Sequence, residues 1–186
     1  MRATEMGGQL KPLDKCWIKV SGISGGKITF KNLPDISDTK SAEYSDENVI
    51  GRASPIKTYS HSSSRQISIT IHCVVTCQKD IGEYLDNLRL LQACVYPSPE
   101  KTSSAPFAPP KICQIKCGKL LSGGKNQADE TGVCCVLKSY NVKFPIDVAW
   151  DEETYLPWKF DIDTSWEVVY SSDDLPDDTR IRRLGA

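Results

Sequence analysis

The eight cysteines have the most reactive side chains in this sequence, and their spacing raises two possibilities, a zinc site and disulfides. Three residues separate Cys73 from Cys77 and Cys113 from Cys117, so the two pairs resemble the halves of a four-thiolate zinc site. Four residues of extended chain cover about 13 Å, however, whereas zinc-bound sulfurs lie about 2.3 Å from one ion. The same span excludes a disulfide within either pair, because bridged Cα atoms lie about 4.4–6.8 Å apart.

The spacing still allows disulfides between cysteines on neighbouring strands. No secretory signal is visible at the start of the sequence, so we expect the thiols to be reduced when the chain folds. At least half of the eight are expected to be buried as small apolar residues. Cys134 and Cys135 are adjacent on an expected strand, which predicts Cys135 inward and Cys134 outward. The candidate bridges join Cys73 or Cys77 to Cys113 or Cys117, and Cys16 or Cys94 to Cys134.

The other reactive residues do not predict an active site. The two histidines, His61 and His72, lie in a serine-rich turn and on the polar side of a strand. A small hydrolase would need a pocket that brings one of them to a cysteine, and no G-x-S-x-G motif is present. The Gly-Gly pairs lack the spacing of a phosphate loop, and the aspartate-rich runs match no calcium loop. We therefore expect no enzymatic activity, no cofactor and no metal.

Net charge and hydropathy argue against two further functional classes, nucleic-acid-binding proteins and membrane-inserted proteins. The 23 basic and 24 acidic residues give a formal net charge of −1, which would not attract nucleic acid. The apolar runs are far shorter than the roughly 20 residues that cross a bilayer. Neither nucleic-acid recognition nor membrane insertion is expected.

The clearest periodic segment is Arg65–Thr76, RQISITIHCVVT, in which apolar and polar residues alternate strictly. Such alternation is typical of a strand with one buried face. A helical apolar stripe follows from Ile81 to Val95, with Asp80 as the expected N-cap and Glu83 as its capping-box partner. Pro97 ends this helix, and residues 98–110 are expected to form a proline-rich connector.

Further alternating segments make the chain β-rich. Strands are expected at 16–20, 27–31, 49–59, 112–117, 133–144, 157–163 and 164–170, with a bulge near Lys138–Ser139. The predicted fold is mainly β (α+β), an antiparallel sandwich or open barrel with one packed helix and long extended arms. One core is expected to contain Ile67, Ile69, Ile71, Leu85, Leu88, Trp158, Phe160 and Trp166.

The domain organisation follows from composition. Residues 1–15 are expected to form an N-terminal arm, and residues 16–170 a single domain. Residues 32–59 are too polar to form a core of their own, so we expect an extended arm inserted in that domain. Residues 171–186, acidic and then basic, form the expected C-terminal tail.

Three segments of the sequence resemble a known family. They are Leu33–Ala42 (LPDISDTKSA), Asn48–Tyr59 (NVIGRASPIKTY) and Arg65–Ile69 (RQISI), and they look like baseplate and tail-tube-like proteins of contractile-tailed bacteriophages. The resemblance covers most of residues 16–170 and is most specific at Ile50-Gly51-Arg52 with Pro55-Ile56.

This resemblance implies a structural subunit that joins the tail tube to the baseplate in a homo-oligomeric ring, a hexamer. Its partners would be other tail and baseplate proteins, and it would be assembled in the host cytoplasm and located in the virion. The expected intersubunit contacts are Arg52, Pro55, Ile56 and Tyr59, since arginine beside apolar side chains is a common interface anchor. The alternatives are a baseplate wedge subunit and a zinc- or disulfide-stabilised binding module.

Overall fold

The computed structural model describes residues 12–48, 50–99, 107–121, 132–152, 155 and 157–170. Most of the expected N-terminal arm, the middle of the proline-rich connector and the C-terminal tail lie outside the described residues.

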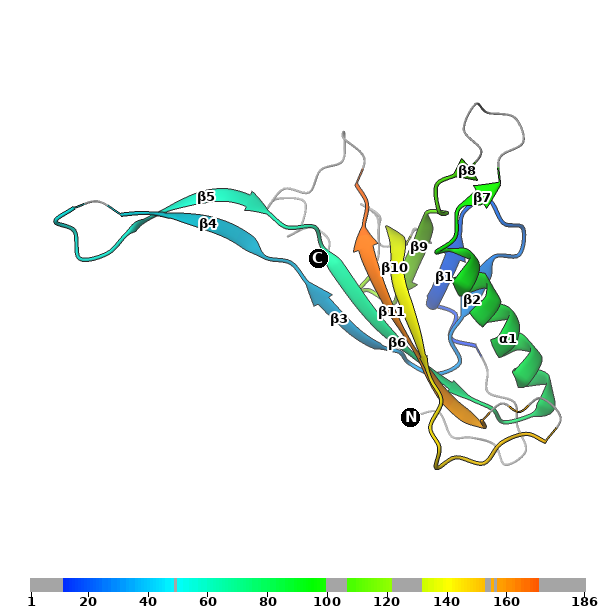
Figure 1. Ribbon diagram of the computed structural model, residues 1–186. Coiled ribbons are helices and arrows are strands. Elements are labelled where there is room, and N and C mark those ends of the chain that lie inside the picture. Colours follow the sequence, from blue (N-terminus) through cyan, green and yellow to red (C-terminus); the bar gives the residue numbers. More distant parts are fainter. Residues whose placement is uncertain are drawn as a thin grey trace.

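The described chain forms one large antiparallel sheet, two short strand pairs and one helix (Figure 1). The fold is mainly β with a single helix and the sheet does not close, as the sequence predicted. Across the sheet the order is β2 (Lys27–Thr29), β1 (Cys16–Val20), β9 (Cys113–Cys117), β10 (Val133–Lys143), β11 (Lys159–Val168), β6 (Gln66–Val74), β3 (Asp35–Thr39). The separate pairs are β4 (Ala42–Glu47) with β5 (Ile56–Ser62), and β7 (Ser98–Pro99) with β8 (Phe107–Ala108).

Strand β6 organises one half of the sheet. Its alternation has the predicted result, since Ile67, Ile69, Ile71 and Cys73 are buried and the residues between them are not. It pairs along its whole length with β11, and its other side pairs with β3. Because β11 also alternates, the two strands present one continuous apolar face.

The helix α1 (Gln78–Ala93) covers part of that apolar face (Figure 1). Tyr84 and Leu91 are buried, and the Tyr84 ring meets the Phe160 ring edge to face at a centroid distance of 6.0 Å. The predicted start of the helix is wrong, because the N-cap is Cys77 and Asp80 lies at the third helical position. The Asp80 carboxylate reaches back and accepts the N–H groups of Thr76 and Cys77, so it caps the helix from inside.

The core prediction is confirmed for Ile67, Ile69, Ile71, Phe160 and Trp166, with Leu88 packed against them, whereas Leu85 and Trp158 do not belong to this core. Trp166 and Phe160 are buried, whereas Leu85 and Leu88 are half-buried and Trp158 is 52% exposed. Alternation would place Trp158 beside Phe160, but β11 begins only at Lys159, after Pro157, so the pleat does not extend to Trp158. The bulge in β10 is confirmed, with a register shift between Leu137 and Ser139.

Candidate assembly interface

Strands β4 and β5 form an arm that projects beyond the sheet (Figure 1). It continues the line of β3 and β6, and hydrogen bonds between Ser41 and Ser63 mark its base, where the Ser63 N–H donates to the Ser41 carbonyl at 2.9 Å. The expected arm at 32–59 is therefore shifted. Residues 35–39 pair with β6 as part of the main sheet, and the arm extends from Ala42 to Ser62.

Every residue in the two arm strands is exposed. The strands are held by their backbone ladder and by cross-strand pairs. The Tyr44 and Tyr59 rings meet edge to face at 5.8 Å, and the Lys57 ammonium lies 2.8 Å from the Asp46 carboxylate. A two-stranded hairpin without a packed face is marginally stable in water. An arm of this kind is therefore suited to bind another surface.

The four predicted interface residues all lie on this arm. Arg52 and Pro55 belong to its tip, Ile56 begins β5, and Tyr59 lies within β5. The tip also presents Ile50, which is fully exposed. In the sequence from Asn48 to Pro55 at the tip, Arg52 is the one charged residue, and Glu47 lies opposite Ile56 where the two strands begin.

A second exposed apolar cluster lies in the β10–β11 connection and was not predicted from the sequence. We define the aromatic loop as Phe144, Ile146, Trp150, Tyr155 and Trp158, whose exposed fractions run from 44% to 95%. The Phe144 and Trp150 rings lie 6.5 Å apart. The available signal was a concentration of large apolar residues in a segment without strand periodicity, mixed with acidic residues such as Asp147 and Glu152. Exposed apolar clusters of this kind mark interaction sites.

The sheet face opposite α1 is polar and centres on His72. Its Nδ1 lies 2.7 Å from Asp161 on β11, and its Nε2 lies 3.1 Å from Asp35 on β3. The hydrogen bond with Asp161, followed by that with Asp35, raises the pKa of His72. The His72 ring therefore ties three strands together. Cys73 follows in an alternating strand and is buried on the other face, so the pair does not form a nucleophilic site.

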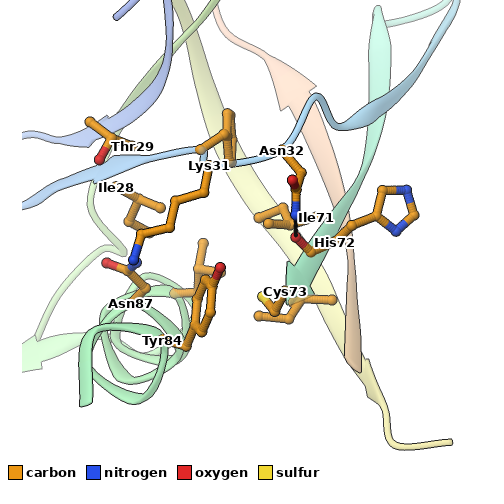
Figure 2. A pocket seen from close by; sticks show the side chains of 12 residues that line it. Ile28, Thr29, Lys31, Asn32, Ile71, His72, Cys73, Tyr84 and Asn87 are labelled. Atoms are coloured by element: carbon orange, nitrogen blue, oxygen red, sulfur yellow. Dashed lines mark hydrogen bonds between the residues drawn. The ribbon is translucent and has the colours of Figure 1, made fainter. Parts of the chain in front are cut away.

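Lys31 crosses from the sheet to the helix beside a cavity of about 20 Å³, large enough for one water molecule (Figure 2). Its side chain is 4% exposed, and its ammonium lies 2.7 Å from Asp80 and 2.5 Å from Glu83. It also lies over the Tyr84 ring, 5.2 Å from the centroid. Burial alone would raise the pKa of Asp80, but the hydrogen bonds from Lys31 and Thr76 hold it below its ordinary value. The cavity is too small for a substrate. The contacts of Lys31 with Asp80, Glu83 and Tyr84 fasten the helix to the sheet.

The structure does not bring together the cysteines that were expected to form disulfides. Strands β11 and β10 separate β6 from β9, so the expected adjacency of Cys73 to Cys113 or Cys117 is wrong. Cys77 lies at the start of α1 and is half-buried. The prediction that Cys135 is buried and Cys134 exposed is confirmed.

Cys134 also lacks its expected partners. Cys16 and Cys94 belong to the buried core, whereas Cys134 is exposed on the opposite face of the sheet, so these candidate bridges are wrong as well. The close thiol pairs are Cys16 with Cys117, at 3.1 Å between sulfurs, and Cys94 with Cys113, at 3.7 Å.

The described residues contain no group of three or more histidine, cysteine or acidic side chains arranged to hold a metal ion. Within the same residues, no helix has the length and hydropathy to cross a membrane. A scan against protein-family models finds no match for this sequence, and a search of curated proteins finds no significant relative.

Proposed function

We propose that this protein is a structural subunit of a contractile bacteriophage tail, a baseplate or tube-initiator subunit that assembles into a homo-oligomeric ring. One observation carries the proposal. The residues at which the sequence resembles that family most specifically, from Ile50 to Ile56, form the tip of an arm whose strands are fully exposed. An exposed arm without its own core gains a packed face when a neighbouring subunit covers it.

The receiving surface on the neighbour is, in this proposal, the aromatic loop. The arm tip carries Arg52 between apolar residues, while the aromatic loop presents tryptophan and tyrosine side chains beside Asp147 and Glu152. Arginine and aromatic residues are the commonest interface anchors, and the opposite charges complement each other. This pairing supports a contact between the arm of one subunit and the loop of the next.

The positions of the two surfaces support a ring. In Figure 1 the arm tip and the aromatic loop lie at opposite ends of the molecule. A contact between two different surfaces is heterologous, and repetition of it produces a closed ring when the rotation closes. The same chain then both gives and receives an arm, as a homo-oligomeric ring requires.

A pair of complementary variants tests this assembly. In the armless variant, Asn-Gly replaces residues 43–61 and joins Ala42 to Ser62, which are opposite each other in the ladder and suit a two-residue turn. In the loop variant, Ile146→Lys and Tyr155→Lys change two exposed side chains of the aromatic loop. Each variant alone should be monomeric by sedimentation. A mixture should form a one-to-one dimer, because only one arm and one loop remain functional.

Charge reversal on the helix supplies the matched control. Arg89 is 73% exposed and belongs to neither the arm nor the aromatic loop, so Arg89→Glu should assemble as the wild type does. A monomeric wild type at high concentration would contradict the ring, and an armless variant that still forms the wild-type assembly would contradict the role of the arm. The viral assignment has a separate test, since antibodies against the chain should label the tail of intact particles in electron micrographs. Labelling elsewhere, or none, would contradict it.

A further inference from the structure

Cys16 and Cys117 face each other across the β1–β9 pair. They are register partners at the end of the ladder, and both side chains are buried at 6% exposure. Their sulfurs are 3.1 Å apart, which is the closest thiol approach among the described residues. The arrangement is set by the backbone of the two strands and needs no movement of a loop or helix.

The second observation is the kind of antiparallel pair that Cys16 and Cys117 form in the β1–β9 ladder. The Gly118 N–H donates to the Lys15 carbonyl at 2.9 Å, and the Cys117 N–H donates to Leu121 rather than to Cys16. Cys16 and Cys117 therefore form a non-hydrogen-bonded pair, the position at which opposed Cα atoms are about 4.5 Å apart and side chains are closest. Disulfides join Cα atoms about 4.4–6.8 Å apart, so this position accepts a bridge without a shift of the strands.

We propose that Cys16 and Cys117 are an oxidation site at which a peroxide closes a cross-strand disulfide between β1 and β9. One thiolate attacks the peroxide and becomes a sulfenic acid as the O–O bond breaks. The second sulfur then displaces the sulfenic oxygen, so that the two thiols and one hydrogen peroxide yield one disulfide and two waters. The pair is oxidised by two electrons, and the peroxide is reduced by two.

The bridge would constrain the fold over a long stretch of sequence. It joins residues that are 101 positions apart, and it fastens the β1–β2 hairpin at one edge of the sheet to β9. Closing a loop of this length removes much of the entropy of the unfolded chain. For a chain of this size we expect the melting temperature to rise by about 10 °C on oxidation.

The reaction should be slow at neutral pH. Burial, followed by the hydrogen bond with Cys16, raises the pKa of Cys117 to about 12. The thiolate is the reactive form, so mildly alkaline buffer and long incubation are appropriate. Cys134, which is exposed, should react first with any thiol reagent, and the Cys134→Ser variant removes that competing site.

The experiment uses the full-length, reduced Cys134→Ser protein treated with hydrogen peroxide, alkylated and digested with trypsin without reduction. Cleavage after lysine releases Cys16–Lys19 and Cys117–Lys119, so the expected product is these two peptides joined. The joined peptide should form in the folded protein and be much rarer after peroxide treatment in concentrated guanidinium. The increase in melting temperature should disappear in Cys16→Ser and persist in Cys77→Ser.

Two outcomes would overturn the proposal. One is the recovery of both peptides alkylated after the half-buried Cys77 thiol has been oxidised. The other is a predominant link between different cysteines, such as Cys94 and Cys113, whose sulfurs are 3.7 Å apart. If Cys16→Ser fails to fold, Cys117→Ser and the linked-peptide measurement on Cys134→Ser decide the question independently.

Discussion

Replacing Lys31 with methionine should destabilise the protein strongly, because the Lys31 ammonium and the Asp80 carboxylate form a buried ion pair. Methionine retains most of the apolar stem of lysine, so the change removes the charge with little loss of packing. Asp80, which is fully buried, then loses its cation. Breaking one side of a buried pair costs about 3–5 kcal/mol, since the remaining charge stays in a poorly solvated site.

The hydrogen bonds that Asp80 accepts place the expected stability loss of Lys31→Met near the lower end of that range. The Asp80 carboxylate would keep three hydrogen bonds, from the Thr76 N–H, the Thr76 hydroxyl and the Cys77 N–H. These bonds satisfy much of its accepting capacity, so we expect a loss of about 3 kcal/mol in the free energy of unfolding. For a chain of this size that corresponds to a decrease of about 6–12 °C in melting temperature.

Urea denaturation, followed by circular dichroism, measures this difference. The control is Lys57→Met, which breaks an ion pair between two exposed side chains and should cost less than about 1 kcal/mol. The double variant Lys31→Met/Asp80→Asn should lose less than the sum of the single variants, because each single change already breaks the same contact. If Lys31→Met were as stable as Lys57→Met, or if the single effects were additive, the pair would not fasten α1 to the sheet.

Two further changes test the sheet. His72, whose pKa is raised by Asp161 and Asp35, contributes stability that is complete below about pH 6.5 and is lost as pH rises through its folded pKa. The free-energy difference between wild type and His72→Gln should therefore be larger at about pH 6 than at about pH 9 in urea melts, and an equal difference at both pH values would contradict the three-strand contact. Gly132→Ala would bring a Cβ to 2.6 Å from a β9 carbonyl oxygen, so we expect a loss of about 1–3 kcal/mol, and an unchanged melting temperature would show that β9 and β10 are not so close.

Local patterns in the sequence predicted much of the sheet. Strict alternation placed β6 and predicted that one of its faces is buried, and the bulge expected near Lys138–Ser139 lies in β10. These features depend on residues close in sequence, for which a period of two is a sufficient signal. The orientation of Cys134 and Cys135 followed from the same rule.

The order of the strands could not be predicted in this way. Strand β1 pairs with β9 and β6 with β11, and no periodicity indicates which distant strand is the partner. For this reason the expected thiol bridges were assigned to the wrong neighbours. The helix start was misplaced because an aspartate is equally plausible as an N-cap and as the third helical residue of a capping box.

The candidate interface was predicted in part. The four arm residues were selected from a resemblance, and the structure places all of them on one exposed hairpin. The boundaries of the arm were missed because β3 is as polar as the arm strands, although it pairs with β6. The aromatic loop was missed because Trp158 was assigned to the core by extending an alternation beyond the start of β11.

The order of strands also has a consequence for synthesis of the chain on the ribosome. β1 can pair with β9 only after about 100 further residues have been synthesised. β6 can pair with β11 only when the end of the described chain has been reached. At about 5–20 residues per second, the β1–β2 hairpin would remain without its partner for roughly 5–20 s. Contacts so distant in sequence are characteristic of slow folding. The β3–β6 ladder with its arm, by contrast, closes locally, so we expect this long hairpin to form first and the remaining strands to add to it once the chain is nearly complete.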